Sequence, residues 1–234
     1  MIKAVLFDLD DTLYIEGDFF RSGFSVVGSE LEARRVGRGD EIAAMLAAIH
    51  FREAREGVFQ KAAARIPFPE EWIPQLVTVF RSHQPRIRLA PDVPPVLRSL
   101  RTKYSVGCVT DGWAEVQRRK IAALGIMEFL DALVVADELG RSFWKPNPAP
   151  IHRCCEMLGV SFPEVIFVGD NPERDMKGAR NAGIRSIRVR RKDSYFYSID
   201  SAPPDVADYE VSNLTEVERI LALLDDGNGP RKKV

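Results

Sequence analysis

The stretch Ala4-Val5-Leu6-Phe7-Asp8-Leu9-Asp10-Asp11-Thr12-Leu13 decides the fold, because an apolar run of strand type ends abruptly in charge. A nearly continuous apolar run is typical of a strand that is covered on both faces. Three carboxylates and one hydroxyl then lie within residues 8–12. Gathering like charges and removing them from water is costly unless something binds them. A divalent cation and a phosphate-bearing ligand are the obvious compensating groups.

The rest of the chain predicts an α/β fold with an insertion. Beyond residue 90 the pattern alternates between helix and strand, which favours a doubly wound parallel sheet with helices on both sides. Residues 18 to about 83 contain no convincing strand and carry apolar residues at helical spacing. We therefore expect a Rossmann-like core formed by residues 1–16 and 88–226, an inserted all-helical domain over 17–87, and a disordered tail over 227–234. Strands are expected over 1–9, 104–109, 132–136, 165–168 and 186–190, and helices over 93–102, 114–124, 149–159, 173–182 and from about 213.

Composition excludes some classes of partner. The chain has 33 basic and 34 acidic residues and a net charge of −1, so no overall field favours a nucleic acid polymer. No apolar run approaches the roughly 20 residues that span a bilayer, and the first apolar stretch ends too early for a secretory signal. Cys108, Cys154 and Cys155 lack metal-type spacing and are expected to be buried small hydrophobes. These features predict a cytoplasmic protein without a membrane partner, as a monomer or homodimer.

Polar residues follow several expected strands, and ligands of open parallel sheets collect beyond the carboxyl ends of the strands. Thr110-Asp111-Gly112 follows the strand at 104–109, and Lys145-Pro146-Asn147-Pro148 follows the strand at 132–136. Gly169-Asp170 through Asp175 follows the strand at 165–168. We expect these segments to meet the charged stretch at residues 8–12.

These segments resemble the four motifs of the haloacid dehalogenase superfamily, whose commonest members are phosphatases. The pattern D-x-D-x-T matches Asp8 to Thr12, and a Thr that ends a hydrophobic strand matches Thr110. The lysine of K-P-x-P matches Lys145, and G-D-x-x-x-x-D matches Gly169 to Asp175. The resemblance covers residues 1–13 and about 90–224, and it implies that the helical insert is a cap domain.

The resemblance implies a Mg²⁺-dependent phosphatase that hydrolyses a small phosphorylated metabolite. Asp8 is the expected nucleophile, since an ionised carboxylate needs no base to attack phosphorus. Asp10 is the expected acid and base, and Lys145 a positive charge for the nucleophile and the phosphoryl group. The other assignments are metal ligation by Asp8, Asp10 through its carbonyl, Asp170 and Asp175, and substrate binding by Thr110, Asp111, Gly112 and Lys145.

Several alternatives stay open at this point. A phosphosugar mutase would share the aspartyl-phosphate, and a non-catalytic phospholigand-binding protein would share the fold. Asp111 departs from the Asn that often follows the motif Thr, and a carboxylate there is unfavourable near phosphate unless it points away or binds a substrate hydroxyl. Asp10 argues against dehalogenation, because dehalogenating members lack that carboxylate. Asp11 is expected to belong only to the turn, and the basic stretch at 185–192 to be a solvated strand edge.

Overall fold

The computed structural model describes residues 1–225, which form two compact units. One unit consists of Met1–Glu16 and the chain from Arg88 onward, and the other of Gly17–Ile87. The role of the second unit as a cap domain stays a prediction. The tail predicted over 227–234 lies outside the described residues.

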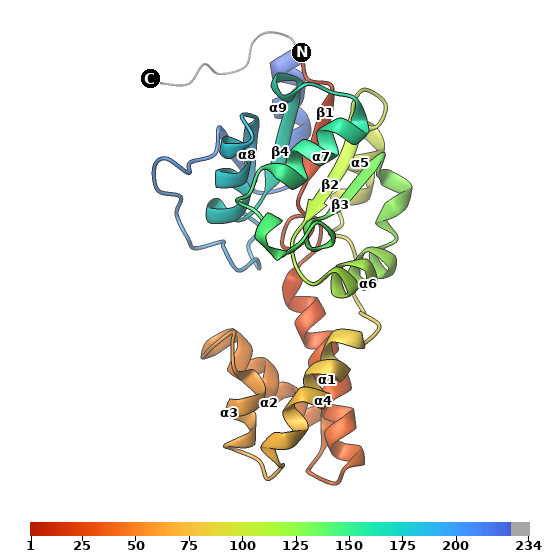
Figure 1. The fold of residues 1–234 in the computed structure, drawn as a ribbon, viewed down its shortest axis with the longest axis vertical. Coiled ribbons are helices and arrows are strands. Elements are labelled where there is room, and N and C mark those ends of the chain that lie inside the picture. The colour runs from red at the N-terminus through yellow and green to blue at the C-terminus, as the bar shows by residue number, and fades with distance from the viewer. Residues whose placement is uncertain (226–234) are drawn as a thin grey trace. The chain divides into compact units, whose positions relative to one another are not determined.

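The first unit is built on a wholly parallel sheet, as predicted, and this sheet has six strands (Figure 1). The strand order is β3-β2-β1-β4-β5-β6, so β1 lies at the centre. Phe7 of β1 is opposite Cys108 of β2 and Val168 of β4. The strands are β1 (Ala4–Phe7), β2 (Ser105–Thr110), β3 (Ala132–Val135), β4 (Val165–Gly169), β5 (Arg185–Val189) and β6 (Tyr209–Val211). The pattern did not predict the short edge strand β6.

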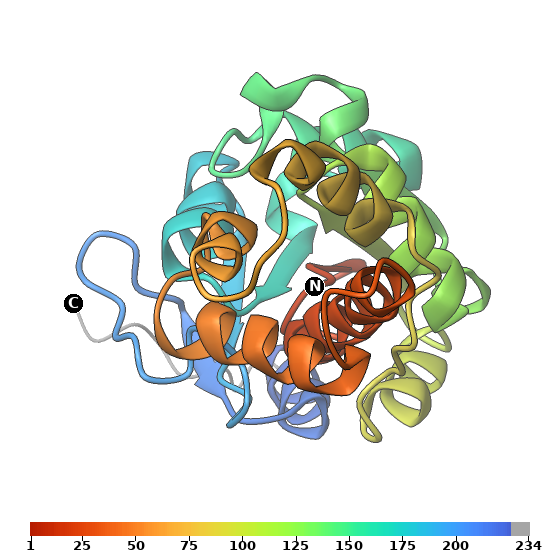
Figure 2. The same ribbon diagram turned by 90° about the horizontal axis from the view of Figure 1, so that it is seen from below.

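Helices cover both faces of this sheet (Figure 2). Helices α7 and α8 pack on one face, where Leu6, Phe167 and Cys154 belong to one buried apolar cluster. On the other face α5 packs on β2 and on α9. The helices are α5 (Val93–Leu100), α6 (Ala114–Leu124), α7 (Ala149–Leu158), α8 (Lys177–Asn181) and α9 (Leu214–Asp225), with a π-helical turn at Pro172–Met176 and 3₁₀ turns at Ile126–Phe129, Ala136–Glu138, Arg141–Phe143 and Phe162–Glu164.

Burial explains the continuous apolar run of β1. Every residue from Ala4 to Phe7 is buried, because both faces of the central strand are covered. Cys108, Cys154 and Cys155 are free and buried, as expected of small hydrophobes. Asp8 thus lies directly after the end of a strand whose two faces are both covered.

The second unit is helical and has its own core of buried apolar residues, including Phe24, Leu46 and Leu76. Its helices are α1 (Glu16–Ala33), α2 (Gly39–Arg52), α3 (Val58–Ala63) and α4 (Ile73–Ser82), with a 3₁₀ turn at Glu70–Trp72. Across residues 1–225, no helix combines the length and the apolar character that a bilayer crossing requires.

The prediction of a solvated edge at 185–192 is wrong for Arg188, which is fully buried. Its guanidinium donates to the carbonyl of Asp170 at 3.0 Å and to the carbonyls of Phe196 and Ile199 at 2.8 and 2.6 Å. Buried carbonyl groups need such donors, because an unpaired one is costly. Arg188 therefore ties the segment after β5 to the loop that carries Asp170.

The same prediction is wrong for Arg191, which is also buried. Its Nε donates to the carbonyl of Thr12 at 2.8 Å, and its two terminal nitrogens pair with Asp92 at 3.0 and 3.1 Å. Asp11 adds a second tie, since its carboxylate accepts from the backbone N–H groups of Glu16 and Tyr195 at 2.8 and 2.9 Å. Asp11 thus does more than form the turn, because it holds the loop after β1 in place.

We expect Arg188→Met to lower the free energy of unfolding by about 3 kcal/mol or more, because it removes the donor to the carbonyls of Asp170, Phe196 and Ile199, the first of which lies in a buried contact. Chemical denaturation of the purified protein measures this change. Arg185→Met, at a half-buried position of the same strand, is the matched control and should change stability by about 0.5 kcal/mol or less. Equal losses in the two variants would contradict this role of Arg188.

Candidate active site

Three neighbouring strand ends bring the predicted segments together. Asp8 directly follows β1, Thr110 ends β2, and Asp170 directly follows β4. The backbone N–H of Asp8 donates to the carbonyl of Val168 at 2.9 Å, which continues the pairing of β1 with β4 beyond the strand. Because the strands are parallel, their carboxyl ends lie at one edge of the sheet. The sequence segments at 8–12, 110–112 and 169–175 therefore form one site.

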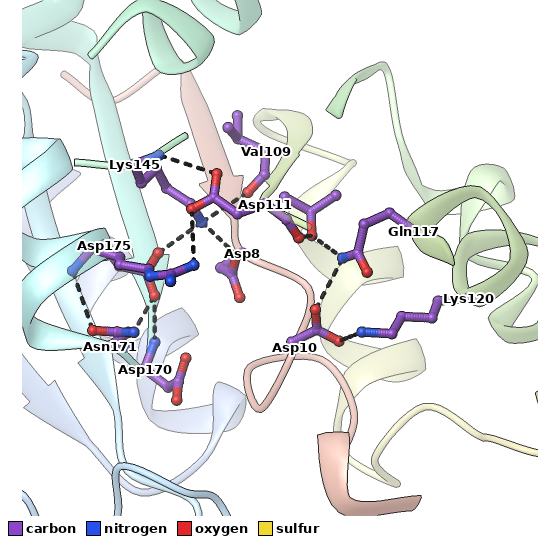
Figure 3. Close-up of polar contacts among 12 residues, drawn as sticks. Asp8, Asp10, Val109, Asp111, Gln117, Lys120, Lys145, Asp170, Asn171 and Asp175 are labelled. Carbon is purple, nitrogen blue, oxygen red and sulfur yellow. Dashed lines mark hydrogen bonds and ion pairs between the residues drawn. The ribbon is translucent and has the colours of Figure 1, made fainter. Parts of the chain in front are cut away.

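Lys145 joins this site as its buried cation (Figure 3). Its ammonium forms an ion pair with Asp8, contacts Asp175 at 2.7 Å and donates to the carbonyl of Val109 at 3.1 Å. Burial alone would lower the pKa of Lys145, but the carboxylates of Asp175 and Asp8 outweigh it and raise that pKa well above its usual range. Lys145 is therefore a permanent positive charge beside the predicted nucleophile.

Asp8, Asp170 and Asp175 form a compact cluster of buried carboxylates. Each offers one oxygen, and these oxygens lie within 4.8 Å of one another. Burial raises the pKa of Asp170 well above its usual value, and the charges of Asp175 and Asp8 raise it further. Burial likewise raises the pKa of Asp8, although Lys145 acts in the opposite direction. The cluster thus brings three carboxyl groups together beside the ammonium of Lys145.

These carboxylates fit a hard cation such as Mg²⁺, which takes oxygen ligands and usually keeps several waters. Oδ2 of Asp170 is buried and has no hydrogen-bond partner among residues 1–225. An unpaired buried carboxylate oxygen is costly, and a cation would satisfy it. Asp8 and Asp170 are the two residues of the cluster best placed to hold such an ion.

Asp175 supports the cluster from behind. Its Oδ1 contacts Lys145, and its Oδ2 accepts from the backbone N–H groups of Asp170 and Asn171 at 3.1 and 3.0 Å. Gly169 permits this approach, since a Cβ at that position would lie 2.5 Å from Oδ2 of Asp175. Both oxygens of Asp175 are thus in use within the protein. We infer that Asp175 orients Lys145 and the loop that carries Asp170.

Asp10 has a separate environment from Asp8, although only one residue separates them. Its Oδ1 accepts hydrogen bonds from the hydroxyl of Tyr14 and, at 2.7 Å, from the ammonium of Lys120. Its Oδ2 accepts from the side-chain amide of Gln117 at 2.9 Å. Burial alone would raise the pKa of Asp10, but Lys120 and the hydrogen bonds outweigh it, so this pKa lies below its ordinary value. The Asp10 carboxylate does not belong to the cluster of Asp8, Asp170 and Asp175.

Sequence reasoning missed Gln117 and Lys120, which lie on α6. Both are buried and occupy the same helix face as Val116, Ile121 and Leu124. The sequence did carry a signal for them: both polar side chains fall within the apolar stripe of a helix that follows a site motif. The interpretation of residues 114–124 as an ordinary covering helix overlooked that signal.

Thr110 and Gly112 stand at the start of the segment that leads into α6. The hydroxyl of Thr110 is buried and accepts from the amide of Gln117 at 2.5 Å. Gly112 has a φ of 116°, in a region that favours glycine, and a Cβ there would lie 3.2 Å from the side chain of Gln117. The turn thus lets the chain leave β2 and bring Gln117 back beside Thr110.

Asp111, the residue that departs from the family pattern, faces the loop of Lys145. Its Oδ1 accepts from the backbone N–H of Lys145 at 3.1 Å. Its Oδ2 is buried without a hydrogen-bond partner among the described residues, and Arg174 lies 3.9 Å away. Burial raises the pKa of Asp111 against the opposing effect of Lys145. One oxygen therefore fixes the lysine loop, while the other can accept a hydrogen bond from a ligand.

Comparison with known proteins gives consistent matches. The sequence model of the family described as "Haloacid dehalogenase-like hydrolase" matches residues 5–189. A glyceraldehyde 3-phosphate phosphatase from Methanopyrus kandleri is 34% identical over 95% of this chain and 99% of its own length. Human N-acylneuraminate-9-phosphatase is 34% identical over 58% of this chain and 53% of its own length.

Solved structures share the fold. The crystal structure of a HAD phosphatase from Thermococcus onnurineus matches with a TM-score of 0.62 and 26% identity, over 94% of this chain and 98% of its own. A 2-haloacid dehalogenase from Pseudomonas syringae matches with a TM-score of 0.66 and 24% identity, over 96% of this chain and all of its own. At that identity the second match shows the fold alone.

We expect Asp170→Asn to remove stabilisation of the protein by Mg²⁺. In EDTA the variant should unfold at a higher temperature than the wild type, because it loses one of three mutually repelling buried carboxylates. Saturating Mg²⁺, at about 100 times its dissociation constant, should stabilise the wild type by about 2.7 kcal/mol and the variant far less. Asp10→Asn, outside the carboxylate cluster, is the control and should keep the Mg²⁺ effect. Equal Mg²⁺ stabilisation of wild type and Asp170→Asn would contradict this assignment.

Proposed function

The chain belongs to the haloacid dehalogenase-like hydrolases, and we propose that it is a Mg²⁺-dependent phosphatase that hydrolyses a small phosphomonoester through an aspartyl-phosphate on Asp8. One observation carries this proposal. Two carboxylates at the end of β1 have different partners, since Asp8 pairs with Lys145 beside Asp170, whereas Asp10 pairs with Lys120. Such a separation suits a nucleophile and an acid–base group.

In the first step an oxygen of Asp8 attacks phosphorus. The bond from Asp8 to phosphorus forms while the bond from phosphorus to the leaving oxygen breaks. Lys145 offsets the charge of Asp8 and of the approaching phosphoryl oxygens, and the hydroxyl of Thr110 would donate to the phosphate. Asp10 delivers a proton to the leaving oxygen, which departs as an alcohol.

In the second step Asp10 acts as a base. It accepts a proton from a water whose oxygen attacks phosphorus, and the bond between phosphorus and Asp8 breaks. Inorganic phosphate and the free Asp8 carboxylate result. The lowered pKa of Asp10 favours its ionised form, which the second step requires, whereas the first step begins from its protonated form.

The metal requirement follows from the charge of the cluster. Asp8 and Asp170 would hold Mg²⁺, with Asp175 orienting the loop behind them. The ion would offset the negative charges of the carboxylates and of the phosphate, which would otherwise repel each other. Ion binding would also lower the raised pKa of Asp8 and favour the attacking carboxylate.

The proposed substrate is a small phosphorylated metabolite, such as a sugar phosphate or triose phosphate. The names of the relatives from Methanopyrus kandleri and human support this class. The free oxygen of Asp111 offers an acceptor for a substrate hydroxyl. We further propose that residues 17–87 are a cap domain, which is supported by a relative that aligns over 95% of the chain and therefore includes most of this unit.

We expect Asp8→Asn to lower phosphate release by at least about 1,000-fold, because the variant lacks the nucleophile. The assay measures free inorganic phosphate over a panel of metabolite phosphates with Mg²⁺. Asp193→Asn, which changes an exposed aspartate of the same unit, is the matched control and should retain activity. Near wild-type turnover by Asp8→Asn would refute the mechanism. Transfer of the phosphoryl group to a second hydroxyl, without free phosphate, would instead identify a mutase.

We also expect EDTA to abolish phosphate release and added Mg²⁺ to restore it, because the uncompensated carboxylates repel the phosphate. The measurement is a titration of initial rate against Mg²⁺ after chelation and buffer exchange. Full activity in excess EDTA would remove the metal from the proposal while leaving the role of Asp8 open to the preceding test.

A further inference from the structure

Two buried polar side chains lie on the face of α6 that also carries the buried apolar residues Val116, Ile121 and Leu124. Gln117 is 1% exposed and Lys120 is 3% exposed. Burying an ammonium group is costly unless it is paired, so Lys120 requires an anionic partner at a fixed place. Its partner is Asp10 at 2.7 Å, and Glu16 lies further away at 3.7 Å. The position of Lys120 is therefore tied to the predicted acid–base residue.

Gln117 also forms a hydrogen bond with the carboxylate of Asp10 (Figure 3). Its amide nitrogen donates to Oδ2 of Asp10 at 2.9 Å and to the hydroxyl of Thr110 at 2.5 Å. Lys120 and the hydroxyl of Tyr14 hold the other oxygen, Oδ1. One helix thus fixes both oxygens of Asp10 and also contacts the residue expected to bind the phosphate.

Helix α6 is itself anchored at the site. The backbone N–H of Ala114, at its first residue, donates to the carboxylate of Asp137 at 2.9 Å. Arg118 pairs with both oxygens of Glu138 at 2.8 Å. These contacts join the first two turns of α6 to the 3₁₀ turn after β3. The helix therefore provides a fixed frame for Gln117 and Lys120.

We propose that Gln117 and Lys120 are positioning residues that hold the Asp10 carboxylate for proton transfer to the leaving oxygen. This inference rests on the proposed phosphatase activity. Neither side chain needs to touch the reacting atoms, because each acts through Asp10. The same frame places the acid–base group at a fixed distance from Thr110, so that proton transfer and phosphate binding share one geometry.

If Gln117 and Lys120 position Asp10, the loss of activity on replacing either of them depends on the leaving group of the substrate. An alkoxide is a poor leaving group and needs a proton from Asp10 as the bond to phosphorus breaks. Nitrophenolate leaves readily without that proton. Because kcat/KM reports the steps up to the departure of the leaving group, it isolates this requirement from the later hydrolysis of the aspartyl-phosphate.

The test compares Lys120→Met with wild type on two substrates, p-nitrophenyl phosphate and the best alkyl phosphate of the metabolite panel. We expect kcat/KM to fall about 100-fold for the alkyl ester, the cost of a misplaced catalytic group, and less than about tenfold for the nitrophenyl ester. Lys120→Arg should restore part of the alkyl-ester activity. The matched control is Arg119→Met on the same helix, where Arg119 pairs with Glu115 at 2.8 Å and should be dispensable.

Two further variants keep the test decisive. Gln117→Leu leaves no charge unpaired and should show the same dependence on the leaving group if Lys120→Met fails to fold. The double variant Lys120→Met with Asp10→Asn should be no slower than Asp10→Asn alone, since Lys120 acts through Asp10. Additive losses in the double variant would overturn the inference.

The outcomes separate the inference from the proposed function. Wild-type protein that releases phosphate from neither ester would refute the phosphatase itself. Wild-type activity with equal losses on both esters in Lys120→Met and Gln117→Leu, or with no loss, would overturn only the positioning role. Turnover of the nitrophenyl ester alone by the wild type would also overturn it, because such an enzyme would not need a proton on the leaving oxygen.

Discussion

The contact between the ammonium of Lys145 and the carboxylates of Asp8 and Asp175 is the constraint on which the site depends. All three groups are buried, and a buried charge is costly unless a group of opposite charge lies beside it. One ammonium cannot balance Asp8, Asp170 and Asp175 together. The remaining negative charge supports the proposed cation, which would satisfy the unpartnered oxygen of Asp170. The balance between these buried charges therefore links the fold to the proposed chemistry.

The parallel sheet makes that balance attainable. Strands β2, β1 and β4 are neighbours, and each ends in a residue of the site or is directly followed by one. Long-range ties then keep the loops in place, as Arg188 does for the carbonyl of Asp170 and Arg191 for the carbonyl of Thr12. Both arginines are buried where they donate to these loop carbonyls. The basic stretch at 185–192 therefore helps to hold the loops of the site.

The sequence predicted the features that local patterns encode, and it missed those that depend on distant partners. Buried strands and their polar ends were visible because hydrophobic periodicity and turn residues act over a few positions. Gln117 and Lys120 were missed because their partner Asp10 lies 107 and 110 residues away. Arg188 was missed because it binds backbone carbonyls, which leave no mark in the side-chain pattern. The strand β6 was missed because three residues are too few to show alternation.

The placement of Asp8 and Asp10 shows how one short loop can supply two kinds of carboxylate. Asp8 lies in the cluster with Lys145, while Asp10, two residues further along the chain, contacts Lys120 of α6. Their pKa values are consequently shifted in opposite directions, upward for Asp8 mainly through burial and downward for Asp10 because Lys120 and its hydrogen bonds outweigh burial. A cation at Asp8 would lower the raised pKa of Asp8, whereas Lys120 and the hydrogen bonds of Asp10 already keep the pKa of Asp10 low. The two roles that we propose for Asp8 and Asp10 thus follow from the lysine that each residue contacts.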